Sequence, residues 1–386
     1  MLWTGLKRGA IQIPVQMTMA EKIIPERIRE ARESTGLTDD QFAEAIDVTR
    51  GAVGHYETGQ TSPRGEVLAR IISVTGLPPS FFTKVRGRSV TRFRMPNWRS
   101  LKRMQRPARL RIGRRLEWTY DIVSLLEEFI DLPSISVPQI DFDFETGDDD
   151  EIELVADSLR QFWELGDEPI QDLPAVLECN GFILINEEVG CDDMDAVSRW
   201  QGGRPYILYA NDVESYPRQL FNLAHELGHI VLHSSVEVNS KNLDKIERQA
   251  NRFAGAFLLP RKRFASEVAS TSIEYFLMMK TRWRVAVAAM VYRCKDLGIL
   301  NPAQVQYMWK QMNVRGIRKK EPGDRDFPLS QPTVLATGLR MLAENGIKSK
   351  AGIVGDLTLN PADIERLSGL ESEELQTKVI PLRLLN

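Results

Sequence analysis

The sequence predicts a multidomain fold in which an all-α domain is followed by an α+β domain and then by a mainly helical C-terminal region. Three observations predict this order. Short helical segments with capping signals fill residues 25–84, strand-like segments lie shortly before an amphipathic segment around 215–232, and helical patterns continue from residue 298. The chain has 386 residues, which is enough for two or three domains with cores of their own.

The composition is that of a soluble globular protein without a strong charge bias. Hydrophobic residues make up 42% and charged residues 27% of the chain, and the formal net charge of −3 points to no particular partner. The three cysteines have no CxxC spacing and are too few for a disulfide framework, which favours a reducing compartment. No apolar run approaches the length of a membrane span. We therefore expect a cytoplasmic protein that does not contact a membrane.

Residues 1–20 are predicted to lie outside the folded domains. They contain Lys7 and Arg8, but the stretch that follows is too polar for the apolar core of a signal peptide. This segment is therefore either a disordered leader or, in part, a stretch upstream of a real start at Met17 or Met19.

Residues 21–84 have the layout of a helix-turn-helix domain. We expect helices over 25–36, 37–48, 49–59, 65–75 and 79–84. The first helix ends at Gly36, and Thr38 is placed to cap the second, which would bury Phe42. In a helix-turn-helix the second helix of the motif enters the major groove of DNA, and here that helix is the segment 49–59.

The residues predicted to contact DNA lie on this third helix. Arg50 and His55 are the best candidates for groove contact, and Thr49 and Gly51 lie beside them. Gly51 and Gly54 weaken the helix and offer no base-reading side chain. The domain also holds more acids than bases, which is unusual for a tight DNA binder. The alternative is a helix-turn-helix that serves dimerisation or the docking of a partner.

Basic charge is concentrated in residues 85–116, which contain eleven arginines and Lys102 but no acid. Such a segment can contact phosphates and add salt-dependent affinity for nucleic acid. It could equally be a linker, or a solvated helix face that folds against the acidic run 141–153. A helix is predicted over 116–130, and the acidic segment 141–150 is the predicted domain boundary.

The α+β domain is predicted over residues 151–325. Its expected elements are helices at 152–164 and 173–180 and strands at 182–186 and 206–209. An edge strand of such a sheet can pair with an extended peptide. The remaining residues, 326–386, are predicted to form a helical region of unknown role.

Three of the four histidines in the chain fall within nine residues, beside a glutamate. His225 and His229 are four residues apart and therefore lie on one face of a helix. Two imidazoles so placed can bind one zinc ion, and the adjacent Glu226 can reach a water on that metal. Ser215 and Pro217 are typical of a helix start. The alternative is a pair of histidines that merely edge a core helix.

A third protein ligand is available on a second amphipathic helix, at 243–260. Glu247 falls within the apolar arc of that helix, where an unpartnered carboxylate is costly and metal coordination would remove the cost. The alternative is a surface glutamate whose stem lies along the apolar face. His233 is a rival ligand, but at 100° per residue it is rotated about 80° from His225. We therefore favour Glu247 as the ligand and expect His233 to support the ligands or to lie on the surface.

The stretch HELGHIVLH followed by IERQANRFAGAFLLP resembles the ImmA/IrrE family of zinc metallopeptidases, which often carry a fused helix-turn-helix domain. The similarity extends over roughly residues 25–325. It includes 196–200, 204–209, 218–221, 279–283 and 286–293. The resemblance implies an α+β zincin-like metallopeptidase domain in which His225, His229 and Glu247 bind Zn²⁺ and Glu226 is the general base.

The N-terminal domain resembles the XRE (Cro/CI-type) helix-turn-helix family. The resemblance is carried by 28–32, 36–38, 42–43, 48–51 and 56–59, together with Pro63. One departure concerns Asp39, because many members of that family carry a glutamine here that contacts a DNA phosphate.

Two functional hypotheses follow. The first is a zinc-dependent endopeptidase with a DNA-binding domain, whose protein substrate would be a repressor or another regulator of gene expression. The second is a non-proteolytic DNA-binding transcription regulator with a structural or sensory zinc site. In either case the helix-turn-helix domain could also mediate homodimerisation.

Overall fold

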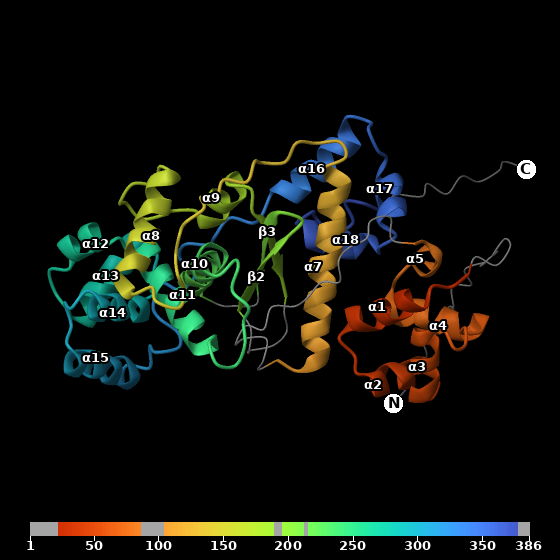
Figure 1. Cartoon of the computed structure of the whole chain (residues 1–386), viewed down its shortest axis with the longest axis horizontal. Coiled ribbons are helices and arrows are strands. Elements are labelled where there is room, and N and C mark those ends of the chain that lie inside the picture. The colour runs from red at the N-terminus through yellow and green to blue at the C-terminus, as the bar shows by residue number, and fades with distance from the viewer. Residues whose placement is uncertain (1–21, 86–103, 189–194, 212–214, 377–386) are drawn as a thin grey trace, which may run out of the picture.

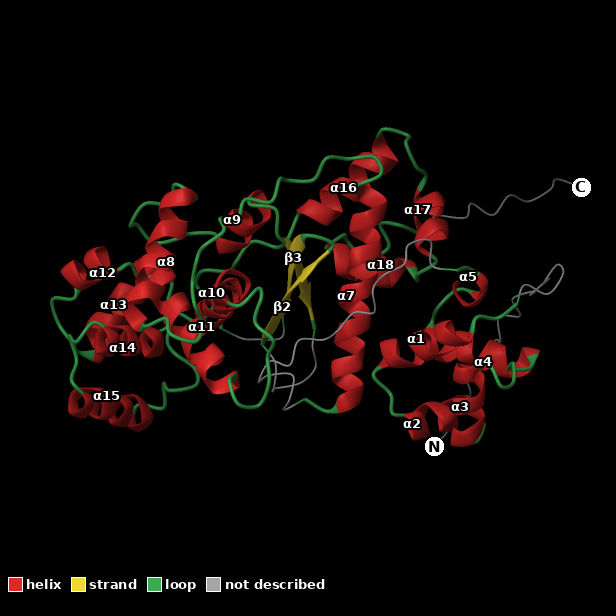
Figure 2. Cartoon of the chain, viewed as in Figure 1, coloured by secondary structure: helices red, strands yellow, loops and turns green. Residues whose placement is uncertain are grey.

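The structure is a computed structural model that describes residues 22–85, 104–188, 195–211 and 215–376. It is mainly helical, with one small sheet near its middle (Figure 2). Helices α1–α5 lie at one end of the molecule, α12–α15 lie at the other, and the long helix α7 stands beside the sheet between them (Figure 1). The predicted fold class is confirmed, whereas the predicted leader 1–20 lies outside the described residues. None of the described helices is long and apolar enough to span a membrane.

The first five helices match the predicted helix-turn-helix layout. They are α1 (Pro25–Thr35), α2 (Asp39–Ala45), α3 (Arg50–Thr58), α4 (Gly65–Thr75) and α5 (Pro79–Thr83). Gly36 ends α1 at a φ of 73°, a left-handed conformation that glycine adopts at little cost. Thr38 and Gln41 form a capping box that starts α2. The domain closes over Phe42, whose side chain is fully buried.

Helix α7 (Arg106–Leu126) differs from the prediction, because it begins at residue 106 rather than 116 and ends at 126 rather than 130. The first half of α7, residues 106–116, is the C-terminal part of the basic segment. In this part the basic segment is neither a linker nor a solvated helix face. Arg114 pairs with Glu33 of α1 at 2.6 Å, and Arg115 pairs with Asp363 at 2.7 Å. These carboxylates compensate the charge of arginines that pack inside the molecule.

The rest of the basic segment, residues 86–103, lies outside the described residues. The prediction that it contacts nucleic acid therefore stays a prediction for those residues.

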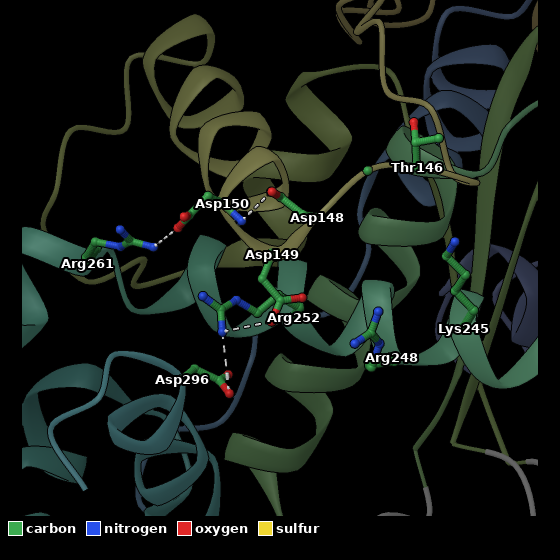
Figure 3. Close-up of a pocket in the computed structure, with 10 residues that line it drawn as sticks. Thr146, Asp148, Asp149, Asp150, Lys245, Arg248, Arg252, Arg261 and Asp296 are labelled. Carbon is green, nitrogen blue, oxygen red and sulfur yellow. Dashed lines mark hydrogen bonds and ion pairs between the residues drawn. The ribbon is translucent and has the colours of Figure 1, made fainter. Parts of the chain in front are cut away.

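In the described structure the acidic run 141–153 meets bases of other helices, not the basic segment. Asp148 caps α8 (Asp149–Phe162), which packs against α11 (Leu243–Leu258), and α12 (Arg261–Glu267) follows α11. Asp149 lies 3.7 Å from Arg252, and Asp150 lies 2.6 Å from Arg261. These residues line a charged cleft of about 560 Å³ (Figure 3). Its four bases and four acids balance, so the cleft carries no net charge.

The sheet has three strands, β1 (Ile183–Glu187), β2 (Ala196–Gln201) and β3 (Arg204–Ala210), in the order β1-β3-β2. Strand β1 runs parallel to β3, and β2 runs antiparallel to it. Gly202 and Gly203 join β2 to β3 with φ values of 59° and 81°, and two positive φ values in a two-residue loop are typical of a type I′ hairpin turn. Strand β2 was not among the strands predicted from the sequence.

Helices cover both faces of the sheet. The remaining helices are α9 (Leu173–Cys179), α10 (Tyr216–Leu232), α13 (Ile273–Trp283), α14 (Val287–Asp296), α15 (Pro302–Val314), α16 (Val334–Glu344), α17 (Lys350–Leu357) and α18 (Pro361–Ser368). Leu184 and Ile207 pack into one core with α8–α15, whereas Ile185 and Leu208 pack into another with α7 and the C-terminal helices. The C-terminal region therefore has a structural role, since it covers one face of the sheet.

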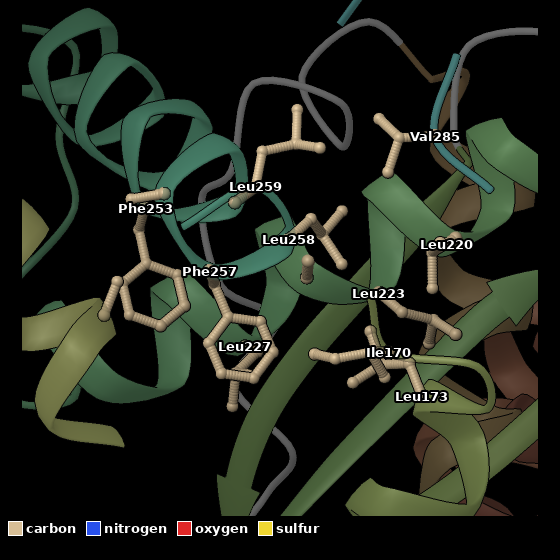
Figure 4. Close-up of a cluster of buried hydrophobic side chains, with 14 of the residues drawn as sticks. Ile170, Leu173, Leu220, Leu223, Leu227, Phe253, Phe257, Leu258, Leu259 and Val285 are labelled. Carbon is tan, nitrogen blue, oxygen red and sulfur yellow. The ribbon is translucent and has the colours of Figure 1, made fainter. Parts of the chain in front are cut away.

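Helices α10 and α11 cross closely, and this crossing places the candidate metal ligands. Apolar side chains of both helices meet in one cluster (Figure 4). They include Leu220, Leu223, Leu227, Phe253, Phe257 and Leu258. At the crossing, a Cβ added to Gly228 would lie 3.0 Å from the Phe253 ring and 3.3 Å from the Ala250 backbone. A side chain at this position would therefore require the Phe253 ring or the α11 backbone to shift by a few tenths of an ångström, whereas glycine fits as it stands.

Candidate metal centre

The structure brings together the three side chains predicted to bind a metal. Ligand atoms of His225, His229 and Glu247 all lie within 4.8 Å of one another. The two Nε2 atoms are 2.9 Å apart. The Glu247 carboxylate lies 3.7 Å from Nε2 of His225 and 3.9 Å from Nε2 of His229. Two imidazoles and one carboxylate that converge on one point form a donor set suited to zinc.

Local sequence explains how each helix presents its side chains. Pro217 stands in the first turn of α10, as predicted, but the Ser215 side chain makes no capping hydrogen bond. The spacing of four residues then aligns the two imidazoles on one face. Glu247 lies one turn before Asn251 on α11, at the edge of its buried face, and is neither fully buried nor on the open surface.

The other ring nitrogens of both histidines are also bound. Nδ1 of His225 lies 3.1 Å from Oδ1 of Asn251, and Nδ1 of His229 lies 3.2 Å from Nδ1 of His233. His233 is only 3% exposed, and its Nε2 lies 3.0 Å from Oε1 of Gln249. A surface position for His233 is therefore wrong, and the residue lies directly behind a candidate ligand.

Both candidate imidazole ligands are held in the neutral form. Burial lowers the pKa of His225 to about 4, although its hydrogen bond with Asn251 opposes the shift. Burial, assisted by the neighbouring imidazoles, lowers the pKa of His229 well below its ordinary value. A neutral imidazole has the free lone pair that a metal requires.

Glu226 is buried beside the candidate ligands. It is 5% exposed, and its Oε2 atom has no hydrogen-bond partner among the described residues. Burial raises the pKa of Glu226 to about 8; a hydrogen bond from Ser198 opposes this shift and the charge of Glu247 adds to it. A carboxylate with a pKa near neutral can accept and return a proton under physiological conditions.

Strand β2 lies against the helix that carries these residues. The Ser198 hydroxyl donates to the backbone oxygen of Glu226 at 3.3 Å, and the Trp200 indole donates to that of Ile230 at 3.3 Å. In the described sheet β2 is an edge strand, so its outer edge has no neighbouring strand there. This strand was not predicted from the sequence, although the pair Gly202-Gly203 is a signal for a hairpin.

The residues predicted to contact DNA lie on an exposed face of α3. Thr49 caps the helix by accepting from the Ala52 amide, and Gly51 and His55 are exposed. The Arg50 side chain is 66% exposed and lies 3.8 Å from Asp39 and 3.5 Å from Asp40 of α2. The structure thus presents all four residues on the outside, but acids flank the one arginine.

The fold and the site together define a class of protein, in which a helix-turn-helix domain precedes an α+β domain with a candidate metal centre. Comparison with protein families agrees with this class. Residues 28–82 match the family model described as helix-turn-helix, and residues 181–295 match the peptidase family model described as IrrE N-terminal-like domain. The chain therefore carries an XRE-type helix-turn-helix domain followed by an ImmA/IrrE-like peptidase domain. No curated protein matches the chain significantly.

Proposed function

We propose that the protein is a zinc-dependent endopeptidase that cleaves a regulatory protein and is directed to DNA by its helix-turn-helix domain. One observation carries the proposal. His225, His229 and Glu247 converge on one point, and the buried Glu226 beside them has a carboxylate oxygen without a hydrogen-bond partner among the described residues. In a purely structural metal site, a buried carboxylate oxygen without a hydrogen bond would cost stability and serve no purpose.

The donor set supports zinc as the metal, with His225, His229 and Glu247 as its ligands. Zinc sites with three protein ligands are typical of catalysis, whereas structural sites usually have four. When bound, zinc supplies Lewis acidity that polarises a carbonyl and makes water nucleophilic near neutral pH.

Glu226 is the proposed general base. Its Oε2 atom would take the proton of the attacking water and hold it while the peptide carbonyl is attacked. The same atom would then deliver the proton to the amine that leaves when the C–N bond breaks. The position of Glu226 suits both steps, because its Oε2 atom is buried beside the candidate ligands and has no hydrogen-bond partner among the described residues.

Strand β2 supports a polypeptide as the substrate. An extended peptide could pair with its outer edge, which would align a scissile bond along α10. The fused helix-turn-helix domain supports a substrate that acts at DNA, such as a repressor. In this proposal Arg50 and His55 contact the groove, and Thr49 and Gly51 bring the start of α3 close to the backbone.

The test compares the wild-type chain with Glu226→Gln on repressors encoded near its gene. The wild type with zinc should produce one discrete cut, and a chelator should abolish it. The variant should bind zinc with the wild-type stoichiometry but cleave about 10²- to 10⁴-fold more slowly, since a general base contributes that much. Equal cleavage by a zinc-loaded variant would contradict the role of Glu226, and no cleavage by the wild type of any candidate would count against the peptidase.

A second candidate function is a transcription regulator in which zinc is structural or sensory. The observation that favours it is the buried contact between the helix-turn-helix domain and α7. Trp118 of α7 donates to Glu30 of α1 at 2.8 Å, and Arg114 binds Glu33 of α1. Through this contact the metal site could influence α1. A change in DNA affinity on zinc removal in the Glu226→Gln variant, with no cleavage by the wild type, would favour this function.

A further inference from the structure

His229 is connected through its Nδ1 atom to a chain of buried polar groups. Nδ1 of His229 lies 3.2 Å from Nδ1 of His233, and Nε2 of His233 lies 3.0 Å from Oε1 of Gln249. The amide nitrogen of Gln249 then donates to the backbone oxygen of Phe144 at 3.1 Å. His233 and Gln249 are 3% and 1% exposed, so water does not replace these partners. The chain runs from α10 through α11 to the loop before α8.

The direction of these hydrogen bonds is fixed once Nε2 of His229 is a metal ligand. A liganding Nε2 carries no proton, so the single proton of the neutral ring is on Nδ1 and is donated to Nδ1 of His233. His233 must then carry its own proton on Nε2, where it donates to Gln249. The Gln249 amide in turn donates to Phe144, as its geometry requires. With the protons placed in this way, every side chain in this series of hydrogen bonds has a partner.

The last acceptor of the chain is held firmly. The amide of Gly147 donates to the backbone oxygen of Asp143 at 2.7 Å, and the amide of Glu145 donates to the Asp143 carboxylate at 2.8 Å. The Lys245 amine of α11 binds the backbone oxygen of Glu145 and lies 5.5 Å from the centroid of the Phe144 ring. The loop is therefore tied to the same helix that carries Glu247.

The second candidate ligand has a much simpler support. Nδ1 of His225 contacts only the exposed Asn251 within this network, at 3.1 Å. Water can replace an exposed partner, but it cannot reach the buried contact behind His229. The two imidazoles should therefore differ in how strongly they depend on the residue behind them.

We propose that His233 and Gln249 are positioning residues that fix the tautomer and ring orientation of His229 and thereby set the zinc affinity of the site. The proposal rests on the zinc site of the proposed function, but it does not require that the protein cleaves anything. Partners of this kind typically change metal affinity about 10- to 100-fold when they are removed.

The test measures zinc affinity by competition with a chelator in the full chain. His233→Phe keeps a ring of similar size without nitrogen and should weaken zinc binding about 10- to 100-fold. His233→Asn keeps an acceptor near the position of Nδ1 and should recover part of that loss. Gln249→Met should cause a smaller loss, since it acts one step further away. Tyr307→Phe, at an exposed position of α15, is the control and should bind zinc like the wild type.

Two further measurements separate positioning from other roles. The difference in unfolding temperature between the wild type and His233→Phe should be smaller without zinc than with zinc. If His233 had only a structural role, the variant would unfold at a lower temperature by the same amount with and without zinc, and its zinc affinity would be unchanged. In the Co²⁺-loaded protein, His233→Phe should shift the absorption bands but keep their intensity. A loss of intensity equal to that of His229→Phe would show that His233 is itself a ligand and would overturn the proposal.

The outcomes also separate this proposal from the peptidase. Weak zinc binding in His233→Phe, together with a zinc-loaded wild type that cleaves nothing, would support the positioning role and count against the proposed function. Unchanged zinc affinity in folded His233→Phe and Gln249→Met, together with a wild type that cleaves, would overturn the positioning role and support the peptidase.

Discussion

The metal centre and the exposed face of α3 both lie where two helices cross, but their polar side chains differ in how far they are exposed to solvent. At the α10–α11 crossing, His229, His233 and Gln249 are buried and contact one another in series, and the partly buried His225 and Glu247 face His229. At the α2–α3 crossing, Arg50 is exposed and shares its charge with Asp39 and Asp40 on the surface. A buried polar group has few acceptable arrangements, whereas an exposed one has many. The first site is therefore defined by geometry and the second by the balance of surface charge.

The change with most effect on stability is expected at the buried ion pair between α14 and α8, and it is compared with the exposed pair on α3. Arg293 of α14 is fully buried, donates to the carboxylate of Glu153 on α8 and also binds the backbone oxygen of Leu259. Arg293→Met should lower the free energy of unfolding by about 3 kcal/mol, the lower end of the cost of breaking a buried ion pair, because Arg252 still contacts the Glu153 carboxylate at 2.7 Å. Arg50→Met is the control and should cost about 0–1 kcal/mol. Urea denaturation of both variants measures the difference.

The stability lost in Arg293→Met should depend on pH. Burial opposes it, but the hydrogen bond and charge of Arg293 hold the pKa of Glu153 below its ordinary value of 4.5. A carboxyl whose pKa is lowered on folding stabilises the protein above its unfolded-state pKa and loses that contribution as the pH falls. The difference between wild type and Arg293→Met should therefore shrink below about pH 4.5. If the difference in unfolding free energy between the two proteins did not change with pH, the titration of Glu153 would not account for the effect of Arg293.

A middle-sized effect concerns the packing that holds the metal centre. Gly228→Ala places a methyl group 3.0 Å from the Phe253 ring and should lower the free energy of unfolding by about 1–3 kcal/mol, as overpacking does. It should also weaken zinc binding, since Glu247 moves with α11. Gly255→Ala is the control, because its added Cβ meets only Arg293 at 3.9 Å and alanine favours a helix by about 0.5–1 kcal/mol. If both changes altered zinc affinity equally, the close packing of α10 against α11 at Gly228 would not be what holds Glu247 in place.

The parts of the site that could be predicted from the sequence depend on local spacing. His225, Glu226 and His229 share one helix, so their relative positions follow from helix geometry alone. Glu247 lies on another helix, but its place in an apolar arc indicated that it points inward. His233 could not be placed in this way, because its burial depends on how Gln249 of α11 meets α10.

The fold was predictable to a similar extent. The helix starts at Thr38 and Pro217 have strong local signals. The start of α7 has Pro107 in its first turn, but arginines dominate its first half, and Arg115 is buried there through ion pairs with distant carboxylates that the sequence does not place. Strand β2 was missed for a related reason, because consecutive residues 196–198 are all buried and no alternation marks the strand.

The smallest expected effect tests whether surface charge limits DNA binding by α3. Asp39→Gln removes one of the two acids beside Arg50, at 3.8 Å, while Arg32, which also pairs with Asp39, keeps its contact with Glu57 at 2.6 Å. Affinity for duplex DNA at low salt should rise roughly two- to five-fold, which matches an exposed pair worth up to about 1 kcal/mol. The gain should fade at high salt, because surface charges are then screened.

A matched change in net charge shows whether the position or only the charge matters. Asp47→Asn also removes one negative charge from the domain, but Asp47 pairs with Arg70 and not with Arg50, and asparagine tolerates its positive φ. If Arg50 is the groove contact, Asp39→Gln should raise DNA affinity more than Asp47→Asn does, and Arg50→Ala should cancel the gain. Equal gains from both changes, unaffected by Arg50→Ala, would mean that α3 meets DNA only through the field of the whole domain and that Arg50 is not its contact.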